Sequence, residues 1–363
     1  MSLSCGIVGL PNVGKSTLFN ALTAAGAEMG NFPFCTIEPN QAVAEVPDEN
    51  LARITSHIQT EKVIPAVVKV VDIAGLIAGA SKGEGLGNKF LANIRETDAI
   101  LHVVRCFENA QVVREDPVDP KKDIEIIELE LALADLETLQ RAIDRVSKKA
   151  RSGDKDSIFE RDLFQRVHDL LEGEQAIRAL DWKDSERAAL KPLCLMSMKP
   201  VLYVANVADD DLDGEGKHAQ AVAAHAEATG SNWISICTDI ESELRNMDPE
   251  EREVFQEDLG VRELGLPRLI RAAYDLLGLQ TYYTAGPKEV RAWTIRAGWK
   301  APQAAGVIHT DFQDKFIRAE VYKVDDLDEH GTETAIKAAG RLRTEGRDYV
   351  MQSGDVCHFL FGR

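Results

Sequence analysis

Residues 9–17 carry the side chains of a phosphate-binding loop, in the order Gly-Leu-Pro-Asn-Val-Gly-Lys-Ser-Thr. Two glycines enclose four residues and are followed by a lysine and a hydroxyl side chain, which is the spacing that such a loop requires. A glycine turn that leads into a helix directs backbone N–H groups and the positive end of the helix dipole at one point, where anions bind. The residues expected to contact nucleotide phosphates are therefore Asn12, Val13, Gly14, Lys15, Ser16 and Thr17.

Two side chains in this loop and one downstream are predicted to act on the phosphates and their metal ion. Lys15 is expected to reach the β and γ phosphates, and the Ser16 hydroxyl to bind Mg2+. Asp72 follows the β-branched run 65–71, so it stands at the carboxyl end of a buried strand, where open α/β sheets bind ligands. We expect its carboxylate to belong to the Mg2+ site.

Two loop residues are predicted to sense the γ-phosphate. Thr36 lies in a proline-bounded loop, where a threonine can offer a second oxygen to Mg2+ and become ordered when triphosphate is bound; the alternative is an ordinary turn threonine. Gly75 follows the strand of Asp72, and its backbone N–H is expected to approach the γ-phosphate. The next residue is Leu76, at the position where related GTPases orient the attacking water with a glutamine, so slow intrinsic hydrolysis is expected.

Residues 206–209, Asn-Val-Ala-Asp, follow an apolar strand at the place where GTPases carry the guanine-reading Asn-Lys-x-Asp. Val207 replaces the lysine whose stem packs along the base. Asp209 keeps a carboxylate that can accept hydrogen bonds from guanine, and Asn206 is expected to face the base beside it. The pattern leaves both adenine and guanine nucleotides open.

The elements that must position these residues form an α/β sheet. Apolar runs at 65–71, 98–104, 199–205 and 232–237 predict buried, mostly parallel strands, with a helix starting at Thr17. His102 lies inside one such run and is expected to be a core histidine. A separate α+β unit of short strands and two helices is expected after Gly278.

Residues 123–195 predict a helical hairpin inserted into the sheet domain. Apolar residues recur there at helical spacing in two runs, separated by a polar turn at Gly153. The first run ends with several Lys and Arg residues between 141 and 151. These charges favour the C-terminal end of a helix dipole, and contact with RNA is the alternative explanation.

Composition limits the function further. The net charge of −18 argues against a surface built throughout to coat nucleic acid, so any contact with RNA must be local. The six cysteines are scattered without metal-binding spacing, which fits a reducing cytoplasm. The sequence predicts no signal peptide and no membrane span.

With these motifs the chain resembles the Obg-like ATPase (YchF) family, P-loop NTPases of the TRAFAC/Obg type, over essentially its whole length. The resemblance rests on residues 9–17, on Asn-Phe-Pro-Phe-Cys-Thr-Ile-Glu-Pro-Asn at 31–40 and on Asp-Ile-Ala-Gly-Leu at 72–76. Residues 308–311 and 316–321 resemble the family's TGS domain, a ubiquitin-like β-grasp module. The resemblance implies a G-domain-like unit at 1–277 that carries the hairpin at 123–195, followed by a TGS domain at 278–363.

The resemblance also implies an activity and a partner. The family hydrolyses ATP in preference to GTP and associates with ribosomes, so the 70S particle or its large subunit is the expected partner, with RNA contacts through the hairpin and the TGS domain. Asn12 matches an asparagine that helps to place K+ in related enzymes, and Leu76 matches the family's hydrophobic substitution. The family usually has Glu where this chain has Asp209, a departure that leaves GTP open.

The predicted function is thus a Mg2+-dependent nucleoside triphosphate hydrolase that acts as a nucleotide-dependent switch in translation. Lys15, Asn12 and Gly75 are its predicted catalytic residues, and Ser16, Thr36 and Asp72 its predicted metal ligands. One alternative is a GTPase of the same fold. Another is an RNA- or ribosome-binding adaptor in which hydrolysis is incidental. A small-molecule kinase is a third, although the sequence carries no acceptor-site signature for it.

Overall fold

The computed structural model describes residues 3–27, 40–73, 86–108, 117–244, 247–260 and 263–362. The chain divides into two compact units, Met1–Val43 with Lys69–Leu269, and Ala44–Val68 with Ile270–Arg363. Among the described residues, no helix combines the length and the apolar character needed to span a membrane.

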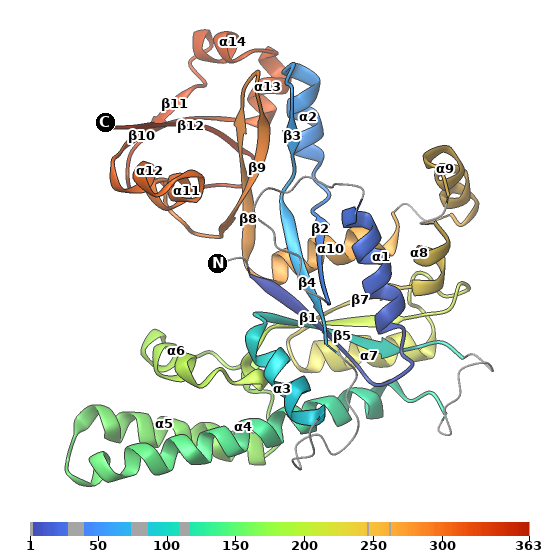
Figure 1. Ribbon diagram of the computed structural model, residues 1–363, viewed down its shortest axis with the longest axis vertical. Coiled ribbons are helices and arrows are strands. Elements are labelled where there is room, and N and C mark those ends of the chain that lie inside the picture. The colour runs from blue at the N-terminus through green and yellow to red at the C-terminus, as the bar shows by residue number, and fades with distance from the viewer. Residues whose placement is uncertain are drawn as a thin grey trace. The chain divides into compact units, whose positions relative to one another are not determined.

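Six strands form the sheet of the first unit, in the order β2-β4-β1-β5-β6-β7 (Figure 1). They are β1 (Ser4–Val8), β2 (Gln41–Glu45), β4 (Val67–Asp72), β5 (Ala99–Arg105), β6 (Val201–Asn206) and β7 (Asn232–Ile236). The neighbours from β4 to β7 pair in parallel. The strands β1, β5 and β6 are buried along their whole length, as parallel strands covered on both faces must be. The predicted α/β sheet is confirmed.

Helices cover both faces of this sheet. Figure 1 shows α1 (Lys15–Ala27) and α8 (Thr238–Leu244) on one side, and α3 (Leu86–Glu96) and α7 (Lys217–Ala228) on the other. Helix α9 (Pro249–Asp258) follows α8, and α10 (Gly265–Leu276) carries the chain into the second unit. Because the parallel strands all end at one edge, the loops after β1, β4, β6 and β7 meet there.

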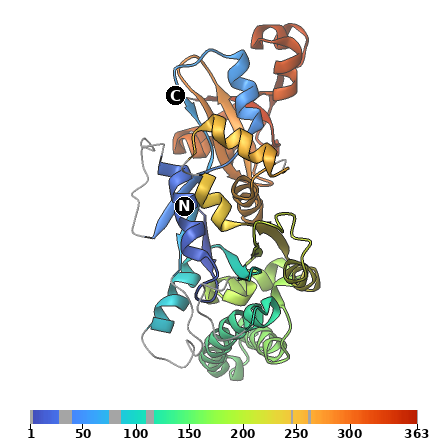
Figure 2. The ribbon, with the colours of Figure 1, turned by 90° about the vertical axis from the view of Figure 1, so that its right-hand side faces the viewer.

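The predicted helical hairpin is formed by α4 (Pro120–Arg151) and α5 (Lys155–Glu172), which lie side by side (Figures 1 and 2). The carboxylates of Asp119 and Asp154 accept backbone N–H groups in the first turns of the two helices, and Gly153 turns the chain with a φ of 88°. The hairpin, α6 (Asp184–Leu190) and the short helices η2 (Ile177–Ala179), η3 (Lys191–Leu193) and η4 (Met196–Met198) bury their own apolar core.

The second unit contains a mixed sheet in the order β11-β10-β12-β8-β9-β3. Its strands are β3 (Val63–Ile64), β8 (Leu279–Ala285), β9 (Val290–Arg296), β10 (Phe316–Lys323), β11 (Arg343–Glu345) and β12 (Asp355–Phe361). Its helices are α2 (Glu49–His57), α11 (Ala301–Ile308), α12 (Thr310–Asp314), α13 (Val324–His330) and α14 (Glu333–Ala338). Tyr282, Phe316 and Phe359 lie in its apolar core.

A segment from the N-terminal half of the chain completes this second unit, which differs from the expected division at residue 277. Strand β3 pairs in parallel with β9, and the Tyr283 hydroxyl donates to the Asp48 carboxylate at 2.8 Å. Arg53 in α2 forms ion pairs with Asp325 and Asp328. These contacts explain why residues 44–68 group with the C-terminal residues.

Candidate functional site

The phosphate loop joins β1 to α1, as the sequence predicts, and its backbone is fixed by left-handed residues. Asn12 has a φ of 61° and Gly14 a φ of 98°. A Cβ on Gly14 would lie 2.3 Å from Nδ2 of Asn206, so only glycine fits there. The Gly14 carbonyl accepts the Leu18 N–H at 2.9 Å, which starts the hydrogen-bond ladder of α1 at the loop.

Lys15 lies inside this loop. Its side chain is buried, and its Nζ donates to the Leu10 carbonyl at 2.6 Å. Burial lowers the pKa of Lys15 to about 8, and the Asp72 carboxylate opposes that shift. The influence is mutual. Burial raises the pKa of Asp72, and the positive charge of the Lys15 ammonium offsets part of that rise. The fold has therefore placed the predicted phosphate-binding lysine and the predicted metal ligand within electrostatic reach.

Asp72 is held by backbone hydrogen bonds on both sides of its strand. Its N–H donates to the Asn40 carbonyl at 2.8 Å, and the N–H of Ile73 donates to the Ile7 carbonyl at 3.3 Å. Asp72 also pairs with Ile7 in the register of β4 and β1. The half-buried carboxylate at the strand end is thus fixed beside the phosphate loop.

The oxygen donors at this edge fit Mg2+. Ser16 is exposed at the start of α1, and Asp72 is a half-buried carboxylate whose pKa is raised by burial. Hydroxyl and carboxylate oxygens are the ligands that Mg2+ prefers, with phosphate oxygens completing its shell. The predicted contributions of Thr36, Gly75 and Leu76 fall on residues 28–39 and 74–85, which lie outside the described residues.

The Asn206 side chain binds backbone rather than lying free for a base. It is 1% exposed; its Nδ2 donates to the Val13 carbonyl at 2.9 Å, and its Oδ1 accepts the Thr238 N–H at 3.1 Å. The amide thus joins the phosphate loop to the loop after β7, with one N–H and one lone pair to spare. Thr238 was not among the predicted site residues, although its place after a strand end could have indicated it.

The other two residues of the base motif differ in exposure. Val207 is buried, and its N–H donates to the Ile236 carbonyl at 2.9 Å, whereas Asp209 is exposed. Burial raises the pKa of the Cys237 thiol, and the Asp239 and Asp209 carboxylates add to that shift. Both carboxylates therefore lie near Cys237, with Asp209 in the loop after β6 and Asp239 at the start of α8.

Comparisons with known proteins agree with this architecture. A family named YchF-GTPase_C, described as a protein of unknown function, matches residues 279–362, and one described as a 50S ribosome-binding GTPase matches residues 4–143. The chain is 52% identical to the ribosome-binding ATPase YchF of Pasteurella multocida over 99% of both chains. It is 43% identical to Obg-like ATPase 1 of Gallus gallus, over 99% of this chain and 92% of that protein.

A solved structure matches over the same length. The YchF GTPase of Schizosaccharomyces pombe superposes with a TM-score of 0.90 and 38% identity, over 99% of this chain and 98% of that one. The chain belongs to the YchF family of Obg-like ATPases. The resemblance drawn from the sequence motifs is therefore confirmed, and the strands β8 to β12 of the mixed sheet fall in the match to the YchF C-terminal domain.

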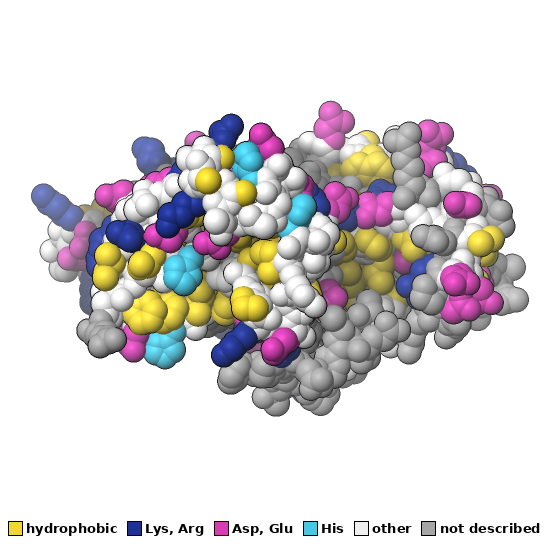
Figure 3. Space-filling model, turned by 90° about the horizontal axis from the view of Figure 1, so that it is seen from above, with side chains coloured by type: hydrophobic (Ala, Val, Ile, Leu, Met, Phe, Trp, Pro, Cys, Tyr) yellow, Lys and Arg dark blue, Asp and Glu magenta, His cyan; other side chains and the backbone are white. Residues whose placement is uncertain are grey.

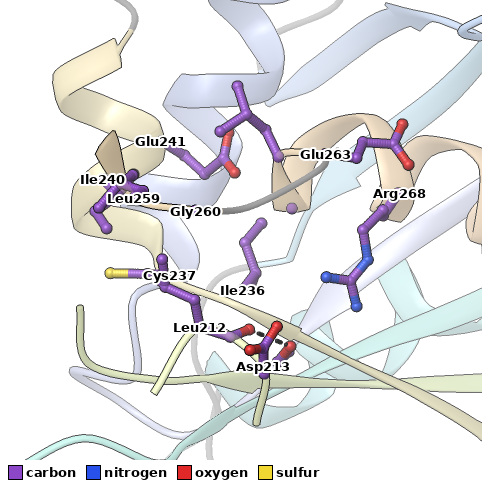
Figure 4. Close-up of a pocket in the computed structure, with 13 residues that line it drawn as sticks. Leu212, Asp213, Ile236, Cys237, Ile240, Glu241, Leu259, Gly260, Glu263 and Arg268 are labelled. Atoms are coloured by element: carbon purple, nitrogen blue, oxygen red, sulfur yellow. Dashed lines mark hydrogen bonds between the residues drawn. The ribbon is translucent and has the colours of Figure 1, made fainter. Parts of the chain in front are cut away.

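A pocket of about 340 Å3 lies beside the end of β7 and the loop that follows it in this YchF fold (Figure 4). Its lining includes the apolar side chains of Ile236, Ile240 and Leu259, together with Arg268 and Asp213. Glu241 lines it too, but this buried carboxylate accepts the Leu266 N–H at 3.1 Å and so caps α10. Among the described residues that line the pocket, none belongs to the phosphate loop, so it is separate from the predicted phosphate site.

A buried polar cluster ties the root of the hairpin to the sheet. The Glu128 carboxylate of α4 accepts hydrogen bonds from Arg178 and from the Tyr203 hydroxyl, both at 2.6 Å, and lies 3.3 Å from His225. Burial opposes the charge on Glu128, but His225, Arg178 and Tyr203 outweigh it and lower its pKa to about 2. Burial lowers the pKa of nearby His102 to about 3, which agrees with a core histidine.

Proposed function

We propose that this chain is a Mg2+-dependent nucleoside triphosphate hydrolase that binds ribosomes and switches between nucleotide states. The observation that supports the proposal is the position of Lys15 in the phosphate loop, within electrostatic reach of Asp72 at the end of the neighbouring strand β4. Curated relatives of about half-identical sequence bear the name ribosome-binding ATPase. The chain has the fold, the loop and the full length of those relatives.

The proposed role of each residue follows from its position in the site. Lys15 and the N–H groups at the start of α1 hold the phosphates and neutralise charge that develops in the transition state. Ser16, Asp72 and the predicted ligand Thr36 would hold Mg2+, which supplies charge compensation to the β and γ oxygens. Asn206 keeps the phosphate loop in register with the base-side loop, and Gly75 is proposed to contact the γ-phosphate. Asn12 would place K+ if a monovalent cation takes part.

Substitution of the loop tests this assignment. We expect Lys15→Ala and Ser16→Ala to reduce ATP hydrolysis by about 10^2-fold or more, because each removes charge compensation in the transition state. Lys89→Ala, which removes an exposed lysine of α3, is the matched control and should hydrolyse ATP at the wild-type rate. Circular dichroism verifies that each variant is folded. Wild-type turnover in either loop variant would refute the site.

Adenine nucleotides are the proposed substrates, although the Asp209 carboxylate can also accept hydrogen bonds from guanine. Val207 is buried where the guanine-binding motif carries a lysine, and the named relatives include ATPases. We expect ATP to bind more tightly than GTP in a calorimetric competition titration. Tighter binding of GTP would assign the chain to the alternative, a GTPase of the same fold.

The tip of the hairpin is the proposed ribosomal RNA contact. Lys148, Lys149 and Arg151 are exposed in the last turn of α4, next to the turn at Gly153. By contrast, the face drawn in Figure 3 carries Lys and Arg among Asp and Glu, so it presents no uniformly basic surface. A local basic tip on an acidic chain fits phosphate contacts that depend on salt.

Removing the positive charges at the tip tests whether these residues contact RNA or only stabilise the C-terminal end of α4. Changing Lys148, Lys149 and Arg151 to Gln should weaken ribosome co-sedimentation and make its salt dependence shallower, since about three phosphate contacts are lost. The matched control changes three exposed lysines elsewhere in the first unit, Lys89, Lys191 and Lys217, to Gln. If ribosome binding weakened equally in both triple variants, general electrostatic attraction rather than a contact at the tip would explain the binding.

A further inference from the structure

Asn40 adopts a backbone conformation that side chains with a Cβ rarely take. Its φ is 69°, and the described non-glycine residues with a positive φ are Asn12, Asn40, Glu174 and Cys194. Asn40 lies directly before β2, and its own side chain is exposed. Packing of the side chain in the interior therefore does not account for this conformation, whereas the backbone carbonyl of Asn40 makes a hydrogen bond.

The Asn40 carbonyl is the acceptor that fixes Asp72. The Asp72 N–H donates to it at 2.8 Å, and the next N–H along β4, that of Ile73, donates to the Ile7 carbonyl on the opposite side. Asp72 is thus held between the start of β2 and the end of β1. The carboxylate is attached to this Cα through Cβ, so the hydrogen bond to the Asn40 carbonyl fixes the backbone from which the Asp72 side chain starts.

The residue type at position 40 decides whether this carbonyl can keep its direction. The left-handed region brings Cβ close to the following carbonyl oxygen, and only glycine and, less readily, asparagine and aspartate adopt it routinely. A β-branched residue is the least compatible with a positive φ. Such a residue would favour an extended backbone, turn the carbonyl away and leave the Asp72 N–H without its acceptor.

We propose that Asn40 is a positioning residue for the Mg2+ site, acting through the backbone hydrogen bond that sets Asp72. The inference rests on the proposed role of Asp72 as a metal ligand. It assigns to Asn40 no contact with nucleotide or metal. Its left-handed conformation supplies the acceptor that keeps the Asp72 carboxylate at the edge of the phosphate loop.

The test measures how much free Mg2+ is needed to reach half of the Mg2+-dependent gain in affinity for a fluorescent ATP analogue. The variants are Asn40→Val, which opposes the left-handed conformation, Asn40→Ala, which opposes it less, and Asn40→Gly, which permits it. Glu174→Val is the matched control, because Glu174 has a φ of 55° and lies after α5 in the hairpin. Thermal melts and nucleotide affinity in EDTA are recorded for every variant.

We expect Asn40→Val to raise the Mg2+ requirement by roughly five- to thirtyfold, the factor that corresponds to the cost of a left-handed conformation. Asn40→Ala should raise it less, Asn40→Gly should stay within about twofold of wild type, and affinity in EDTA should not change. Glu174→Val should lower the melting temperature and leave the Mg2+ requirement at the wild-type value.

Two results would overturn the inference. One is a wild-type Mg2+ requirement in both Asn40→Val and Asn40→Ala with a lower melting temperature, since position 40 would then matter for stability alone. The other is an equal rise in Asn40→Gly and Asn40→Val. Asp72→Asn separates this failure from that of the proposed site: if it too leaves the Mg2+ requirement unchanged, Asp72 is not a ligand and the site assignment itself fails.

Discussion

The Lys15 ammonium lies buried against a backbone carbonyl, and this placement makes nucleotide binding sensitive to pH. With its pKa lowered to about 8 in the free protein, Lys15 begins to lose its proton near that pH. Bound triphosphate favours the charged form and raises the pKa again, so binding takes up a proton above pH 8. Affinity for ATP should be flat below pH 8 and fall above it, by up to about tenfold per pH unit.

Calorimetry between pH 7 and pH 9.5, in buffers of different ionisation enthalpy, measures both the affinity and the proton uptake. Lys15→Arg keeps its charge across this range and should show no comparable slope. A constant wild-type affinity up to pH 9.5 would show that the Lys15 proton is not linked to nucleotide binding.

Asn206 is expected to support the site as a whole rather than to select a base. Asn206→Ala leaves the Val13 carbonyl and the Thr238 N–H without their partner, which should destabilise the unliganded protein by about 2–4 kcal/mol. Affinities for ATP and GTP should fall by a similar factor. Asp209→Ala should instead change the ratio of the two affinities.

Chemical denaturation and paired titrations with the two nucleotides measure these effects. If Asn206→Ala changed the ratio of the ATP and GTP affinities without lowering the unfolding free energy, the Asn206 amide would contact the base directly.

At the scale of elements, the Glu128 cluster gives the root of the hairpin a stability that depends on pH. The pKa of Glu128 in the folded chain is about 2, below its ordinary value near 4.5. Its contribution is therefore fully present above about pH 4.5 and is lost as the pH falls toward 2. The difference in unfolding free energy between wild type and Glu128→Gln should be about 1–3 kcal/mol near pH 6 and shrink on acidification.

Denaturant titrations at several pH values between 3 and 6 give this difference. A gap that stays constant over that range would mean that packing, not charge, accounts for the effect of the substitution.

Elements whose periodicity is strong were predictable, and elements that depend on distant partners were not. Residues 201–206 are all buried, and their sequence predicts a strand without information from the rest of the chain. By contrast, α2 has two buried residues, Leu51 and Ile54. Its Arg53 forms ion pairs with Asp325 and Asp328, which lie far along the chain. Among the described residues, the unit after Gly278 contains four helices, α11 to α14, where two were expected.

The same distinction holds in the site. Spacing alone predicts Lys15, Ser16 and Asp72 as site residues, because the loop motif and the strand end locate them. The roles of Asn40 and Thr238 depend on a backbone angle and on a hydrogen bond between loops that are far apart in sequence. The place of Thr238 after a strand end could have indicated its position, but no local pattern gives the hydrogen-bond partner of Thr238 or the backbone angle of Asn40.

At the scale of the whole molecule, the second unit cannot be removed by cutting the chain at residue 277. Such a truncation leaves α2 and β3 without β9, Tyr283 and the acidic residues of α13. We expect the fragment 1–277 to bind a hydrophobic dye and to aggregate on heating. The Val46 N–H donates to the Ala66 carbonyl at 2.9 Å, so the ends of the intervening segment are adjacent.

This adjacency supplies the control. A fragment that ends at 277 and also replaces residues 47–65 with a short glycine linker should bind less dye and melt cooperatively. Equal behaviour of the two fragments would mean that residues 44–68 fold without the C-terminal residues.

The central proposal, that this chain is a ribosome-binding nucleotide switch, is tested most directly by single-turnover hydrolysis of ATP. The rate is measured in Na+ buffer, in K+ buffer and with ribosomes added. Leu76 cannot orient water, and enzymes that have the glutamine but lack an arginine finger already run near 10^-4 per second. The account predicts slow hydrolysis in Na+ alone and a rise of at least about tenfold with K+ or ribosomes. A rate of about 1 per second or more in Na+ alone, or no response to either addition, would contradict it.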